Sequence, residues 1–154
     1  MAGQMIIFYI LYYLPFLQAK VFSHLVHFYA VVSSMVIDLF GFKTSVTGDA
    51  IYSAEFSISI KRGCDALEPM ALVTAGIIAF PSSLNWKLKG LLTGLSFLFI
   101  LNIVRIVTLY LTGIYSPGIF QTMHTDVWQV IFILAGIGYW FIWVRKAVSV
   151  KKTA

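Results

Sequence analysis

The sequence predicts an all-α integral membrane protein, a bundle of four to five transmembrane helices with a short β-like loop outside the membrane. Hydrophobic residues make up 60% of the 154 residues and charged residues only 11%, whereas soluble domains are about half apolar and about a quarter charged. The apolar residues form runs close to the ~20 residues that cross a bilayer. The basic residues stand in short groups beside these runs, as residues that set membrane topology do.

The runs divide the chain, residues 1–154, into helices of a single multipass domain. Residues 21–42, 88–112 and 123–144 are long enough to span the membrane. Residues 66–80 are a shorter candidate, in which Pro69 fits the first turn of a helix. Residues 3–19 are marginal because Pro15 weakens the end of the run. With that segment the chain has five spans, and without it four spans and an interfacial segment.

The basic residues predict the orientation of these helices. Three cations, Lys43, Lys61 and Arg62, flank the loop of residues 43–63. Seven others fall on the opposite side of the membrane: Lys20, Lys87, Lys89, Arg145, Lys146, Lys151 and Lys152. The positive-inside rule therefore places the loop of residues 43–63 outside the cytoplasm. Apolar residues and serines alternate at the end of this loop, which predicts a short β-hairpin or extended pair over the outer face.

Composition also excludes several classes of site and partner. The single cysteine, Cys64, excludes an intrachain disulfide and any site built from several thiolates. His24 and His27 lie one helical turn apart but lack a third ligand, so no metal site and no cofactor are predicted. The net charge of +5 comes from residues beside apolar runs. It therefore predicts topology rather than nucleic-acid binding.

Arg105 is the charged residue whose position is hardest to explain without a function. It lies inside an apolar run, where a guanidinium costs at least ~2.5 kcal/mol unless it faces protein or water. The alternative is that its side chain snorkels to the outer interface. Asn102 lies one turn earlier on the same helix face, and we expect it to hold the guanidinium by hydrogen bonding.

Cys64 directly precedes the helix predicted for residues 66–80. A helix N-terminus and nearby cations, here Lys61 and Arg62, favour a thiolate. Asp65 and Glu68 oppose it, so the sequence leaves the direction of the pKa shift of the thiol open. A lone cysteine is otherwise a small buried hydrophobe.

His124 is expected at the outer start of the last helix. It can exchange a proton near neutral pH, although a histidine there is also commonly an interfacial or capping residue. Asp126 follows it and could orient a neighbouring side chain. Together, Cys64, Arg105 and His124 are predicted to reach one membrane face as nucleophile, electrostatic stabiliser and base. Asn102, Glu68 and Asp126 are the predicted supporting residues.

Three short motifs in this order resemble the exosortase/archaeosortase family. They are RGCDALE at residues 62–68, NIVRIV at residues 102–107, and Met123-His124 followed by Val127-Trp128-Gln129. The resemblance covers about residues 56–143 and is closest to the short bacterial members of the exosortase H type. Many members of the family have a small residue and a glycine after the cysteine, whereas this chain has Asp65-Ala66. The chain is also shorter at its N-terminus than the larger members.

The resemblance implies a membrane cysteine protease or transpeptidase in which Cys64, Arg105 and His124 are the reactive residues. Its substrates would be exported proteins with a C-terminal sorting signal, made of a recognition motif, one transmembrane helix and a basic tail. The acceptor would be water, or an amine from a lipid or cell-surface component. The enzyme would reside in the bacterial cytoplasmic (inner) membrane, with its active site on the extracytoplasmic side. The competing hypothesis is a small transporter or assembly subunit in which Arg105 binds an anion.

Overall fold

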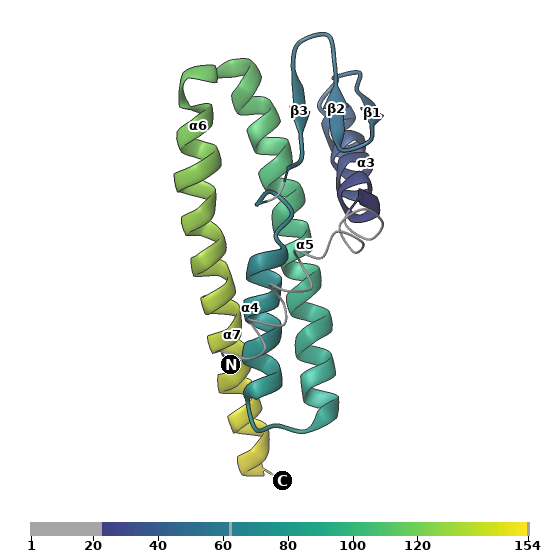
Figure 1. Ribbon diagram of the computed structural model, residues 1–154. Helices are drawn as coiled ribbons and strands as arrows, with labels where there is room; N and C mark the ends of the chain where they lie inside the picture. Colours follow the sequence, from purple (N-terminus) through teal and green to yellow (C-terminus); the bar gives the residue numbers. More distant parts are fainter. Residues whose placement is uncertain (1–22, 62, 154) are drawn as a thin grey trace.

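The structure is a computed structural model that describes residues 23–61 and 63–153, with side chains through residue 149. The predicted span of residues 3–19 lies outside the described residues. Most of the described chain is helical, in the order α3, three short strands, α4, α5, a group of short helical turns and α7. Figure 1 shows α5 and α7 as two long helices that run side by side.

Among the described residues, two helical stretches are long and apolar enough to cross a membrane. They are α5 (Leu84–Tyr115) and the stretch Pro117–Ser149. With 32 residues, α5 is about 48 Å long, well beyond the ~30 Å of the hydrocarbon core. α3 (Ser23–Leu39) and α4 (Leu67–Ala79) are shorter, with 17 and 13 residues. The chain is thus a mainly helical membrane protein, and the number of four to five spans stays a prediction.

α3 and α4 lie along α5 one after the other, α4 beside its lower half and α3 beside its upper half (Figure 1). Near the start of α3, Tyr29 stacks on Phe99 with ring centroids 4.9 Å apart. Phe99 is fifteen residues into α5, or about 22 Å from its start. α3 therefore covers only the second half of α5, although the hydropathy of residues 21–42 predicts a full crossing. Hydropathy reports how apolar a helix is, not which part of its neighbour it covers.

A three-stranded antiparallel sheet packs against α3 in the order β1 (Ser45–Thr47), β2 (Ala50–Tyr52), β3 (Ser57–Ser59). This antiparallel structure agrees with the predicted β-like loop, with three strands in place of two. Ile51 pairs with Val46 on one side and Ile58 on the other, and it is fully buried in the cluster that contains Tyr29. His27 Nδ1 donates a 2.8 Å hydrogen bond to the Gly48 carbonyl, so the β1–β2 turn lies beside the first turns of α3.

Aromatic side chains of α7 pack against glycines of its neighbours in the lower half of the bundle. A Cβ on Gly94 would lie 2.5 Å from the Tyr139 ring, and a Cβ on Gly90 would overlap the Trp143 indole. The Tyr139 hydroxyl also donates a 2.6 Å hydrogen bond to the Gly90 carbonyl. These glycines let α5 and α7 approach closely. We call residues 67–98 and 128–149 the lower region, and residues 23–66 and 99–127 the upper region, after their places in Figure 1.

The long helices extend past their predicted ends. α5 begins at Leu84 and ends at Tyr115, where the apolar run predicts residues 88–112. The last helix is predicted for residues 123–144, but α7 (Trp128–Thr153) continues through the basic residues that follow the apolar run. Lysine and arginine have high helix propensity. The apolar run therefore marks the part that suits the membrane, while the helix itself continues beyond it.

Candidate active site

Cys64 lies in the short segment that joins β3 to α4, and it is 7% exposed. Its amide donates to the Lys61 carbonyl at 2.9 Å, which closes a turn. Gly63 has φ +86° and Ala66 has φ +57°, so the chain bends through left-handed conformations on both sides of the thiol. An alanine in that region is uncommon. The bend turns the chain from the sheet into α4 and leaves Cys64 in the upper region, near its border with the lower region.

The Cys64 thiol contacts the ring of His124. Its Sγ lies 3.6 Å from His124 Nδ1 and 3.7 Å from Nε2. His124 belongs to the π-helical turn Met123–Val127 (η3), which follows the 3₁₀ turn Pro117–Ile119 (η2) and the single helical turn Phe120–Thr122 (α6). The His124 ring stacks on Phe120 with centroids 6.0 Å apart and planes 8° apart. Single π-turns inside helices often occur at functional sites.

Arg105 connects the segments that carry Cys64 and His124. Nη1 donates to the Gly63 carbonyl at 3.0 Å, and Nη2 donates to the His124 carbonyl at 3.2 Å. Arg105 is only 6% exposed, and its guanidinium carbon lies 5.5 Å from the centre of the Phe132 ring. The snorkelling alternative therefore does not describe this side chain. The planar guanidinium thus links the β3–α4 segment to the π-helical turn, and the fork of donors on arginine suits two such contacts.

Asn102 holds the backbone of the cysteine rather than the guanidinium. Its Nδ2 donates a 3.0 Å hydrogen bond to the Cys64 carbonyl, and the residue is fully buried. The prediction that Asn102 binds Arg105 is therefore wrong. The two side chains do share a helix face. Arg105 donates to the carbonyls of Gly63 and His124, whereas Asn102 donates to the carbonyl of Cys64.

At the site, Arg105 Nε has no hydrogen-bond partner within the described residues, and the side chains of Tyr29 and Asn102 interact with each other. Asn102 and Tyr29 are fully buried. Buried polar atoms without partners are few in native proteins and cost free energy. Such atoms also occur in the lower region, Trp86 Nε1 and Trp140 Nε1 among them, so the site is distinguished by its thiol, imidazole and guanidinium.

The other two predicted supporting residues lie at the margin of the site. Glu68 is exposed in the first turn of α4, where it lines the same end of a groove as Arg105. Asp126 is exposed, and its carboxylate accepts a 3.2 Å hydrogen bond from the Thr125 hydroxyl. The structure brings Cys64, Arg105, His124 and Asn102 together, and it leaves Asp126 outside this group. Asp126 follows His124 by two residues, and two residues of helical turn place side chains on nearly opposite faces.

The surroundings of Cys64 settle the direction of its pKa shift. Burial is the largest effect and raises the pKa of the thiol. The positive charge of Arg105 opposes this, and the negative charge of Asp65, itself 1% exposed, adds to it. Lys61 is exposed, and Arg62 lies outside the described residues. Burial thus favours the thiol form of Cys64 over the thiolate, and His124 is the neighbouring group that can accept its proton.

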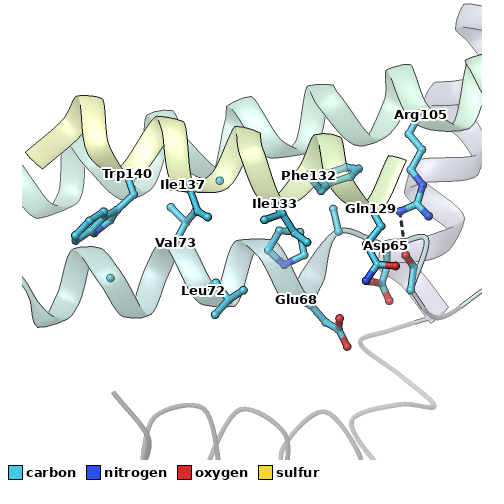
Figure 2. A pocket seen from close by; sticks show the side chains of 15 residues that line it. Asp65, Glu68, Leu72, Val73, Arg105, Gln129, Phe132, Ile133, Ile137 and Trp140 are labelled. Carbon is cyan, nitrogen blue, oxygen red and sulfur yellow. Dashed lines mark hydrogen bonds between the residues drawn. The ribbon is translucent and has the colours of Figure 1, made fainter. Parts of the chain in front are cut away.

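A groove of about 600 Å³ begins at this site and runs between α4 and α7 (Figure 2). Arg105, Asp65 and Gln129 lie at one end of it, and Trp140 lies at the other. Among the described residues, no group of three His, Cys, Asp or Glu side chains could hold a metal ion. The arrangement offers a nucleophile, a base and a fixed cation at the end of an apolar groove.

Several residues of the site carry no signal in the sequence. Phe132 and Phe120 look like ordinary apolar residues of a membrane helix, yet they contact Arg105 and the His124 ring. Phe120 could have been found from its spacing, because it precedes His124 by four positions, about one helical turn. Tyr29 is more than thirty residues from Cys64 in the chain, and only the packing of α3 on α5 brings it near the site.

Comparison with known proteins gives one match. The family model described as Transmembrane exosortase (Exosortase_EpsH) matches residues 3–141, which is most of the chain. No curated protein matches. No solved structure matches either. The family match covers all three motifs and agrees with the membrane helices and with the resemblance noted in the sequence. The chain therefore belongs to the transmembrane exosortase family.

Proposed function

We propose that this chain is a membrane-embedded cysteine protease or transpeptidase that cleaves the C-terminal sorting signal of exported proteins. The observation that carries the proposal is the contact of Cys64 Sγ with both ring nitrogens of His124, at 3.6 and 3.7 Å. A thiol beside an imidazole is the arrangement by which proteins activate cysteine as a nucleophile. Membership of the exosortase family supports the same class of reaction.

The first half of the reaction acylates Cys64. His124 takes the thiol proton as the sulfur attacks a backbone carbonyl carbon, and the new S–C bond turns the carbonyl oxygen into an oxyanion. When the intermediate collapses, the C–N bond breaks and His124 returns the proton to the leaving amine. The products are a thioester on Cys64 and the released C-terminal fragment. Burial raises the pKa of the thiol, and the contact with His124 supplies an acceptor for the thiol proton in the first of these transfers.

The second half releases the exported protein. Water, or an amine from a lipid or cell-surface component, attacks the thioester carbon while His124 takes one of its protons. The C–S bond then breaks and the proton returns to the sulfur, which restores the resting thiol. Hydrolysis and transfer share every step except the acceptor.

Arg105 and Asn102 support these steps by charge and by position. The guanidinium stabilises negative charge on sulfur, or on the developing oxyanion, because it lies beside Cys64 in a buried site. Its hydrogen bonds to the Gly63 and His124 carbonyls also keep the base at a fixed distance from the thiol. Asn102 fixes the Cys64 backbone itself. Enzymes gain rate when reacting groups are held in position before the reaction.

The site suits a substrate that approaches from the outer part of a membrane. Arg105 lies ten residues before the end of α5 and 21 residues after its start, or about 15 Å and 32 Å along the helix. The basic residues at the other end of α5 and on α7 favour a cytoplasmic location for that end. We therefore place Cys64 near the extracytoplasmic surface of the bacterial inner membrane. The sorting signal, with its recognition motif, membrane helix and basic tail, would present its cleavage site there.

The geometry favours this function over an anion site for a transporter or assembly subunit. Two nitrogens of the Arg105 guanidinium already donate to backbone carbonyls, and the side chain is 6% exposed. α5 is also a continuous helix across the position of Arg105, whereas transporters commonly bind ions at breaks in their helices. An anion carrier would need Arg105 but not Cys64.

The test is cleavage of a co-expressed exported protein that carries a tripartite C-terminal signal from the same genome. We expect Cys64→Ala and His124→Ala to abolish the mobility shift that marks cleavage, while both proteins still insert in the membrane. His24→Ala is the matched control, because His24 is exposed and lies on α3 away from the thiol. Full cleavage by the Cys64→Ala protein would disprove the proposal.

Mass spectrometry of the cleaved product separates the two fates of the thioester. A free carboxylate at the new C-terminus indicates hydrolysis, and an added lipid or glycan amine indicates transfer. Addition of hydroxylamine gives a further check, because it intercepts a thioester and releases a hydroxamate. Absence of that hydroxamate in a reaction that proceeds normally would contradict the acyl-enzyme step.

A further inference from the structure

The groove between α4 and α7 is continuous with the candidate active site. Its lining includes Gly63, Asp65 and Arg105, and Gly63 and Arg105 are hydrogen-bonded to each other beside Cys64. From that end it runs along both helices to Trp140 (Figure 2). Trp140 lies eleven positions after Gln129 on α7, which is about 16 Å of helix. A molecule in the groove would therefore extend from the thiol down into the lower region.

The chemical character of the groove changes along its length. Its charged residues, Asp65, Glu68 and Arg105, all lie at the upper end. Below them the lining is apolar, and Leu72, Ile133 and Ile137 are 55%, 51% and 61% exposed there. An occupant that matches this surface has a polar part beside Cys64 and an apolar part below it.

The depth of the groove restricts what a peptide in it can be. Its walls are α4 and a helix long enough to cross a membrane, so its lower part faces hydrocarbon rather than water. A peptide there must satisfy its own backbone hydrogen bonds, and a single chain does so only as a helix. Gly136 leaves room for one, because a Cβ at that position would meet only Val73, at 3.5 Å. Small residues at such positions let helices pack closely.

We propose that this groove docks the transmembrane helix of the peptide substrate, whose preceding residues pass Arg105 in extended form and reach Cys64. The inference rests on the proposed function, and it adds where the substrate helix binds. Docking against α4 and α7 sets the height of the helix in the membrane. The peptide bond that reaches the thiol is then chosen by its distance from the start of that helix.

Cross-linking tests the docking directly, because the chain has a single cysteine. In the Cys64→Ala protein, Ile137→Cys places a thiol in the groove. Leu134→Cys is the matched control, since Leu134 lies on the same helix, is 65% exposed and does not line the groove. The probe is a synthetic peptide with a Leu/Ala membrane helix, an extended N-terminal segment, a lysine tail and one cysteine at successive helix positions. Protein and probe are reconstituted together in phospholipid vesicles.

We expect disulfide cross-links from Ile137→Cys to exceed those from Leu134→Cys by about tenfold, with maxima every three to four probe positions as helical packing requires. Equal yields from the two positions would overturn the proposal. Cross-links from Ile137→Cys to cysteines placed in residues 3–19 of the same chain, with no competition from the probe, would also overturn it. That result would assign the groove to the chain itself.

A second pair of variants tests the groove with the native thiol in place. Gly136→Leu fills the groove, whereas Gly138→Leu adds the same side chain where a Cβ meets nothing within 4 Å. We expect Gly136→Leu to raise the KM for cleavage about tenfold relative to Gly138→Leu, an effect of about 1.4 kcal/mol on binding. Labelling of Cys64 by a small maleimide should stay the same in both. An equal KM in the two variants would contradict the docking.

The two proposals can fail separately. If Cys64→Ala abolishes cleavage but the cross-links show no preference for Ile137→Cys, the enzyme assignment stands and the docking site is wrong. If Cys64→Ala still cleaves, the proposed chemistry is wrong whatever the cross-links show.

Discussion

The upper and lower regions of the bundle are built in different ways. The lower region packs tryptophan and tyrosine of α7 against glycines of α4 and α5. The upper region contains all the buried polar and charged residues of the described chain: Ser33, Ser34, Asp65, Asn102 and Arg105. It also contains the left-handed Ala66 and the π-helical turn. Close packing stabilises a fold, whereas buried polar groups and unusual backbone cost free energy and are retained where they have a use.

The largest expected effect comes from changing the upper region at Arg105. Arg105→Lys keeps the charge but loses the planar fork that reaches both the Gly63 and His124 carbonyls. We expect cleavage to slow by about 10²–10³-fold, the usual loss for an electrostatic group of an active site. Arg145→Lys, an exposed change on α7, is the control. Retention of more than a tenth of the rate would mean that charge alone suffices.

A change in the lower region should affect stability and leave the thiol chemistry intact. A side chain on Gly90 would overlap Trp143, so Gly90→Val must displace an indole or separate two helices. We expect a loss of about 1–3 kcal/mol in the free energy of unfolding, as for overpacked cores. Thermal unfolding in detergent measures it, with Gly138→Val as control because that position is open. A changed rate of Cys64 alkylation in the folded protein would show that the regions are coupled.

Asp65 tests the electrostatics of the boundary between the two regions. Its negative charge raises the pKa of the Cys64 thiol. Asp65→Asn removes the charge and keeps an oxygen that can accept the Leu67 amide, which donates at 3.1 Å in the native protein. The thiol pKa should therefore fall, and the rise of alkylation rate with pH should move to lower pH. A shift in the opposite direction would mean that Asp65 acts mainly by supporting Arg105.

The smallest expected effect concerns the backbone at Ala66. Its φ of +57° is unfavourable for alanine and free for glycine. Ala66→Gly relieves that strain but removes a methyl group that is 3% exposed. We expect a net gain of about 0.5 kcal/mol in stability, less than the full left-handed penalty. A clear loss in thermal unfolding would show that the methyl contact outweighs the strain.

Sequence patterns predicted the features that depend on composition. Runs of apolar residues predicted the long helices, and the cost of a charge in a membrane singled out Arg105. The order of the three motifs predicted the family, which the family match confirms. The structure brings Cys64, Arg105 and His124 together. Their catalytic roles stay a prediction.

The rest depends on packing that no local pattern encodes. Residues 21–42 are apolar enough to span a membrane, yet Tyr29 stacks on Phe99 and places α3 beside only half of α5. Asn102 shares a helix face with Arg105, but its partner is a carbonyl 38 residues away in the chain. Helix propensity and hydropathy are properties of neighbouring residues, so neither reports such contacts.

The π-helical turn of Met123–Val127 sets the angle, about the helix axis, between His124 and the residues of α7 that line the groove. Each residue of an α-helix advances by about 100°, so one residue more or less turns everything before it by that angle relative to everything after it. Within the turn, His124 contacts the Cys64 sulfur; after it, Phe132 and Gly136 line the groove. Deletion of Thr125 would keep His124, Phe132 and Gly136 in the chain but turn His124 by about 100° relative to the other two. Chain length at this turn therefore matters as much as the identity of its residues.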